Sequence, residues 1–173
     1  MRRVSLNARM AHEAAFSDEL EIVLLSIEHA GLDAPLLLST DPTTRLGIEP
    51  LRYGTRSTWL SGGTAREFEF VGLAAELPDD IEDAPPEAQL VISNVVAGLP
   101  KLMRSFQDRP TVNLAVVMAT TPDLVEMEYR GLAIVEANGD TAETRLSVTR
   151  EAVEDETVPM DRFTRARFPG LYR

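Results

Sequence analysis

Apolar residues recur with a period of two in several separate segments, and this alternation limits the fold more than any other feature of the sequence. The first segment, Leu20 to His29, carries Val23, Leu25 and Ile27 on one face and Ile22 and Leu24 on the other. Successive side chains of an extended strand point to opposite faces, so this pattern predicts a β-strand.

The same alternation predicts further strands. Thr64–Leu77 places Glu67 and Glu69 outward and Phe68 and Phe70 inward. The other expected strands are Ala34–Ser39, paired with the first strand through a turn at Gly31–Asp33, then Ala88–Ile92, Val112–Met118 with Val112, Leu114, Val116 and Met118 on one face, Glu126–Glu136 and Thr141–Arg150. Asn138-Gly139 predicts a hairpin turn between the last two, because both residues tolerate positive φ.

The order of these elements indicates the fold class. About six or seven strands follow one another without the regular strand–helix rhythm of parallel α/β folds. The sequence therefore predicts a mainly β protein, an antiparallel β-sandwich or small barrel with two short helices and extended terminal arms.

Two short helices and two arms complete the expected organisation. Ser5–Phe16 reads as a helix capped by Ser5, with an apolar stripe of Leu6, Met10 and Ala14. It is too short to be stable alone and must dock on its own domain or on a neighbouring subunit. A second helix is expected from Leu99 to Phe106. We divide the chain into an N-terminal helical arm (1–18), a β-rich domain (19–158) and a C-terminal extended tail (159–173).

One long excursion interrupts the β-rich domain. Residues 41–63 contain prolines, glycines, threonines and Trp59, the only tryptophan. We expect this excursion to be irregular, with at most one short strand. Trp59 is expected to anchor either the core or a subunit interface, and with Tyr53 it could also stack a sugar.

Charge and cysteine content exclude several functions. The net charge is −11, and such a surface repels phosphate backbones, so general nucleic-acid binding is not expected. No cysteine is present, which excludes disulfides, thiol catalysis and cysteine-ligated zinc or iron–sulfur clusters. No hydrophobic signal segment is found near the N-terminus, and no apolar run approaches the roughly 20 residues that span a bilayer. We expect a soluble protein.

Catalytic signals are weak. The only histidines are His12 and His29, and neither adjoins a nucleophile motif. Phosphate-binding glycine loops and zinc-protease motifs are missing. Asp79, Asp80, Glu82 and Asp83 could hold a divalent cation, but their spacing does not match a calcium loop, and we interpret them as a solvated acidic turn or as the lining of a lumen. We predict that the protein is not an enzyme and uses no cofactor or metal.

The C-terminal tail contrasts with the acidic body. Arg162, Arg165, Arg167 and Arg173 alternate there with Phe163, Phe168, Leu171 and Tyr172. Interleaved arginines and aromatic rings can bind nucleic acid. The interpretation we favour is apolar docking onto the body or a neighbouring subunit, in which arginine stems pack and their charged ends meet acids.

Four stretches in the same order resemble a phage and prophage tail-protein family described as a domain of unknown function, DUF1833. They are Leu24–His29, Phe68–Phe70 continuing into Leu77–Asp80, Leu90–Val95, and Phe163–Tyr172. The resemblance implies a structural component of a siphophage-like tail tip. It supplies no catalytic residues.

The resemblance sets the functional hypothesis. We expect a virion protein, assembled in the host cytoplasm, that forms a ring in the distal tail, baseplate or hub region through which DNA passes without specific binding. Six copies would follow tail-tube symmetry and three would follow a hub or fibre; tail tube, hub and fibre proteins are the other expected partners. The expected subunit-interface residues are Leu6, Met10, Trp59, Phe163, Phe168, Leu171 and Tyr172. The alternatives are a receptor- or carbohydrate-binding β-module and a tail assembly factor.

Overall fold

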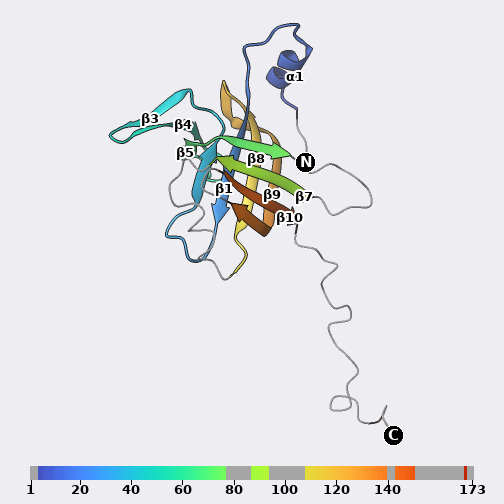
Figure 1. The fold of residues 1–173 in the computed structure, drawn as a ribbon. Helices are drawn as coiled ribbons and strands as arrows, with labels where there is room; N and C mark the ends of the chain where they lie inside the picture. The colour runs from blue at the N-terminus through green and yellow to red at the C-terminus, as the bar shows by residue number, and fades with distance from the viewer. Residues whose placement is uncertain (1–3, 77–86, 94–107, 140–142, 151–169, 171–173) are drawn as a thin grey trace.

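The structure, a computed structural model, describes residues 4–76, 87–93, 108–139, 143–150 and 170. The described part is mainly β, with one helix and a single mixed sheet that is not closed (Figure 1). The elements are α1 (Leu6–Glu13), β1 (Glu21–Glu28), β2 (Leu36–Ser39), β3 (Thr44–Ile48), β4 (Leu51–Ser57), β5 (Arg66–Phe70), β6 (Leu73–Glu76), β7 (Glu87–Ser93), β8 (Thr111–Met118), β9 (Thr121–Gly139) and β10 (Glu143–Arg150).

The ten strands follow the order β3-β4-β5-β2-β1-β8-β9-β10-β7-β6. Every neighbouring pair is antiparallel except β2 and β5, which run parallel. The prediction of a mainly β protein is therefore confirmed, but the sheet is mixed and not wholly antiparallel as predicted. The parallel pair was not foreseen.

A first core lies on one face of the sheet. It gathers buried side chains from β1, β2, β7, β8, β9 and β10, together with Val71 between β5 and β6. Leu38 of β2 and Ile92 of β7 belong to this one cluster although four strands separate β2 from β7 in the sheet order. The sheet must therefore curve around this core.

A second core lies on the opposite face of β1 and β8. Ile22, Leu24, Ala115 and Val117 point into it, and they alternate along the chain with residues of the first core. Burying apolar side chains on both faces of β1 matches the two-sided pattern of Leu20–His29, so that prediction is confirmed. The cover of this second core comes from the segment that was expected to be irregular.

The prediction that residues 41–63 are irregular, with at most one short strand, is wrong. This segment folds as the β3–β4 hairpin, and β4 then pairs with β5. A register shift between Arg45 and Gly47 makes Leu46 an extra residue in β3, so the period-two pattern is interrupted. Gly47 and Pro50, which lie close to this bulge, further obscured the alternation of apolar residues that predicts strands.

The strand expected over Thr64–Leu77 is also corrected, because it is two strands. Phe68 is fully buried as predicted, but β5 pairs with β2 and β6 pairs with β7 at the far end of the sheet order. The linking residues bond to both neighbours: the Val71 amide donates to the Ser39 carbonyl (2.9 Å), and the Ser93 amide donates to the Gly72 carbonyl (2.7 Å).

The remaining strand predictions have mixed outcomes. The β1–β2 hairpin, β7 and β8 occur where expected. β9 and β10 pair as expected, but Asn138 and Gly139 lie inside β9, with Asn138 opposite Arg145, so they do not form the turn. β9 also begins earlier than predicted, directly after β8.

Several predictions fall outside the described residues. These are the helix from Leu99 to Phe106, the acidic residues Asp79, Asp80, Glu82 and Asp83, and the C-terminal residues Phe163, Phe168, Leu171 and Tyr172. Within the described ranges, no helix is long and apolar enough to cross a bilayer.

Gly54 holds β4 against β5 at unusually short range. Its φ is +156°, and a Cβ added there would lie 1.9 Å from the Phe68 carbonyl oxygen. Backbone cannot move away as a flexible side chain can, so we expect Gly54→Ala to lower the free energy of unfolding by at least about 3 kcal/mol. Urea denaturation measures this change.

The matched control is Gly62→Ala. Gly62 also has positive φ (+68°), but no atom lies within 4 Å of its added Cβ. This variant isolates the conformational penalty, about 1–2 kcal/mol. Equal losses in the two variants would contradict the close approach at Gly54.

Candidate functional site

Helix α1 docks over one end of the curved sheet through a small set of contacts. Its first turn is capped as predicted, since the Ser5 hydroxyl accepts from the Ala8 amide (3.1 Å). The Ser5 amide donates to Glu126 Oε2 in β9 (2.6 Å), and Ala8 is buried. At the other end of the helix, His12 Nε2 lies 3.0 Å from Glu21 Oε1.

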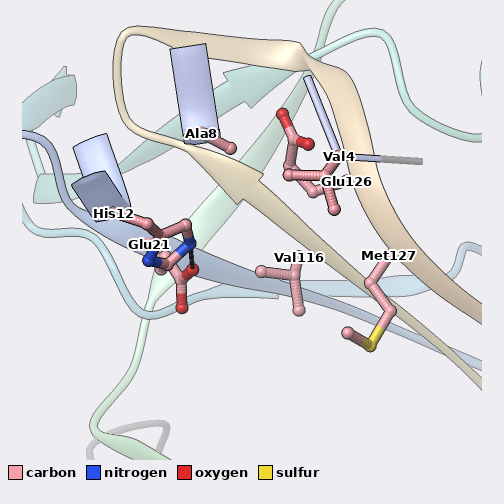
Figure 2. Close-up of a pocket in the computed structure, with 7 residues that line it drawn as sticks. All are labelled: Val4, Ala8, His12, Glu21, Val116, Glu126 and Met127. Carbon is pink, nitrogen blue, oxygen red and sulfur yellow. Dashed lines mark ion pairs between the residues drawn. The ribbon is translucent and has the colours of Figure 1, made fainter. Parts of the chain in front are cut away.

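A cavity of about 280 Å³ lies between α1 and the sheet (Figure 2). Its lining combines apolar and ionisable side chains: Val4, Ala8, His12, Glu21, Val116, Glu126 and Met127. Figure 2 shows Ala8 and His12 entering from the helix, while Val116 and Met127 come from the strands beneath. This cavity is where the arm meets the body.

Glu126 owes its position to an irregularity of β9. Val116 pairs with Met127 and Val117 pairs with Val125, so Glu126 is an extra residue that β8 does not match. Bulges of this kind redirect a side chain, and here the carboxylate reaches the Ser5 amide. Oε1 of Glu126 is buried and has no hydrogen-bond partner among the described residues. The hydrogen bond from the Ser5 amide therefore uses one of the two carboxylate oxygens of Glu126.

The histidines do not assemble a catalytic site in the described part of the chain. His12 contacts a carboxylate, and His29 Nδ1 accepts from the Gly31 amide in the turn after β1. The described residues also contain no group of three or more His, Asp or Glu side chains arranged to hold a metal ion. The described residues do expose two apolar surfaces.

The first such surface is on α1. Leu6 and Met10, both predicted as interface residues, are 71% and 62% exposed. Glu13 lies on the same helix face and is also exposed. We call Leu6, Met10 and Glu13 the arm stripe. Phe16, in the segment that leads from α1 to β1, is 97% exposed.

The second surface is on the β3–β4 hairpin and was not recognised as a surface from the sequence. Ile48 pairs with Leu51, and Arg45 pairs with Tyr53. Leu51 and Tyr53 are two residues apart on β4, so all four side chains share one face. We call Arg45, Ile48, Leu51 and Tyr53 the hairpin face. Each of them is exposed.

The opposite face of the hairpin carries ion pairs. Arg52 contacts Glu69 (2.8 Å) and Glu67 (3.6 Å), and Arg56 contacts Glu67 (3.1 Å). The hydrogen bond to Glu69 raises the pKa of Arg52 above its ordinary value. These charges are therefore matched within the chain.

Trp59 was expected to anchor either the core or a subunit interface, and it lies in the core, so its assignment to the interface is corrected. It is 4% exposed, and its ring stacks on Phe68 with the centroids 5.8 Å apart. Its Nε1 donates to Glu128 Oε1 in β9 (2.7 Å). Trp59 therefore anchors the second core, and it cannot form a sugar-stacking surface together with the exposed Tyr53.

The region around Trp59 fastens the hairpin strands to β9. The Ser57 hydroxyl donates to the Pro122 carbonyl (2.7 Å), and both the amide and the hydroxyl of Thr58 donate to Asp123 Oδ1 (2.6 and 2.9 Å). These bonds span 65 positions in the sequence. They fix the base of the hairpin while its tip stays uncovered.

No protein-family profile and no curated protein matches the chain. The resemblance to a tail-protein family therefore stays a prediction.

The docking of α1 can be tested at Ala8. Replacing Ala8 with Asp places a charge beside Glu126, and we expect the helix to detach. Trypsin cleavage after Arg9, which lies within α1, should then become at least about five-fold faster. The control Asn7→Asp adds the same charge at an exposed position of the same helix. Equal acceleration in both variants would contradict the docked arrangement.

The Trp59–Glu128 contact predicts a pH dependence of stability. Burial alone would raise the pKa of Glu128, but the hydrogen bonds from Trp59 and Arg130 lower it below its ordinary value. A lowered pKa stabilises the folded state above the unfolded pKa, and this contribution is lost as pH falls through the folded pKa. We expect Glu128→Gln to lose less stability than the natural chain between neutral pH and about pH 3.

Urea titrations at the two pH values measure that difference. Glu49→Gln, which removes one carboxylate from the exposed hairpin turn, is the control. If Glu128→Gln and Glu49→Gln lose as much stability as the natural chain, the contact does not act as described.

Proposed function

We propose that the protein is a non-enzymatic structural subunit that assembles with further copies of itself, as the ring-forming component of a siphophage-like tail tip. The proposal combines the family resemblance with the surfaces described above. Its site of assembly would be the host cytoplasm and its final location the virion.

The main observation in support of this proposal is that exposed apolar side chains are concentrated in a few segments of the chain. Of the nine large exposed apolar residues in the described ranges, seven lie in the β3–β4 hairpin, in the N-terminal arm or in the segment that joins the arm to β1. They are Leu6, Met10, Phe16, Leu20, Ile48, Leu51 and Tyr53. Apolar patches that project from a folded body are typical of surfaces that bind another protein.

For the shape of the body we propose a small barrel-like arrangement. The direct link from β5 to β6 through Val71 and Gly72 supports it, because this link bonds to β2 on one side and to β7 on the other. The shared core of β2 and β7 supports it too. Such a body would place the arm and the hairpin on its outside.

The negative charge suits a conduit for DNA. A net charge of −11 repels phosphate groups and would let DNA pass a ring wall without binding to it. Six copies would match tail-tube symmetry, and three would match a hub or fibre. Tube, hub or fibre proteins would contact the faces of the ring.

Antibody labelling and mass spectrometry of finished tailed particles, made by cells that encode the chain, test this function. We expect the chain to be present in several copies per particle at one end of the tail. If it occurs in assembly intermediates but not in finished particles, it is an assembly factor and the structural proposal is wrong.

A further inference from the structure

The arm stripe and the hairpin face lie on different parts of the molecule. In Figure 1 the β3–β4 hairpin extends away from the other strands on the left, whereas α1 lies at the upper right. Both surfaces are apolar and uncovered: Leu6 and Met10 on the arm, Ile48 and Leu51 on the hairpin, each at least 60% exposed. A single copy does not bring them together.

We propose that the hairpin face of one copy docks on the arm stripe of the next copy, so that the protein associates head to tail with itself. This inference rests on the proposed function, for which it names the contact surfaces. The four apolar side chains would form the centre of the contact and exclude water from it.

Charge favours this pairing over the alternatives. Residues 44–70 contain four arginines and three glutamates, a net charge of +1, whereas residues 4–21 contain one arginine and four acids, a net charge of −3. Arg45 shares the face of Ile48, and Glu13 shares the face of Met10. A hairpin-to-hairpin contact would instead bring together two regions of net positive charge, and an arm-to-arm contact would bring together two regions of net negative charge.

The proposed contact also limits the types of assembly that are possible. Two different surfaces that complement each other generate a ring when the rotation between copies closes, and an open filament when it does not. In a symmetric dimer the same contact would occur twice between two copies, and the double cysteine variant described below would then stop at a cross-linked dimer. The proposed arrangement is the ring or filament, in which each copy contacts two neighbours.

Cross-linking through introduced cysteines tests the contact cleanly, because the natural chain has none. A short bis-maleimide reagent is added to Met10→Cys, to Ile48→Cys, to a mixture of the two, and to the double variant. We expect the mixture to give a cross-linked dimer, the double variant to give a ladder of higher species, and each single variant to stay monomeric on a denaturing gel.

The control replaces the hairpin cysteine with one at the exposed Asp33, in the turn between β1 and β2. Met10→Cys with Asp33→Cys should give no ladder. Dimers from Ile48→Cys or Met10→Cys alone would overturn the proposal in favour of a symmetric contact. A double variant that gives no ladder, or only a monomer linked within one chain, would overturn it as well.

Point variants measure the strength of the contact. Ile48→Asp should weaken self-association at least about ten-fold, whereas Val135→Asp, at a 51% exposed apolar site on β9, should leave it unchanged. Arg45→Glu and Glu13→Arg should each weaken it by up to about five-fold, and the two together should restore it. Equal effects of Ile48→Asp and Val135→Asp, or failure of the charge exchange to restore association, contradict the contact.

The outcome separates this inference from the proposed function. If finished particles contain the chain but the double cysteine variant gives no cross-linked ladder, the hairpin–arm contact is wrong and the structural role remains supported. A ladder from a chain that is absent from finished particles would support the contact and overturn the role.

Discussion

The packing of Trp59 against β9 is the interaction on which the arrangement of the surface depends. Trp59 stacks on Phe68 of β5 and donates to Glu128 of β9, so it joins two parts of the sheet that are separated in strand order by β2, β1 and β8. It closes the second core beneath β4 and β5. The base of the hairpin is fixed there, whereas the apolar side chains nearer its tip are exposed.

Two backbone irregularities also help to position the exposed surfaces. The extra residue Leu46 in β3 and the extra residue Glu126 in β9 each interrupt a ladder, and each lies next to one of the two exposed surfaces. Glu126 holds the start of α1, while the close approach at Gly54 holds β4 against β5. Local departures from regular strand pairing thus hold both elements on the sheet. One chain therefore carries two different exposed apolar surfaces.

The sequence predicted what is locally encoded and missed what distant partners decide. The two-sided burial of β1 and the cap at Ser5 follow from neighbouring residues, and both are confirmed. The division of residues 64–77 into β5 and β6 depends on β2 and β7, which no local pattern reveals. The burial of Trp59 depends on β9 in the same way. The interface role of Leu6 and Met10 stays a prediction, and the hairpin face was hidden by the bulge and by the neighbouring glycine and proline.

A density map of the assembled protein, at a resolution that shows side chains, would show which surfaces the copies use to contact one another. We expect Ile48 and Leu51 of each copy to lie against Leu6 and Met10 of the next copy around a ring or along a filament. An assembly in which these four side chains face solvent, while the copies meet through other surfaces, would contradict it.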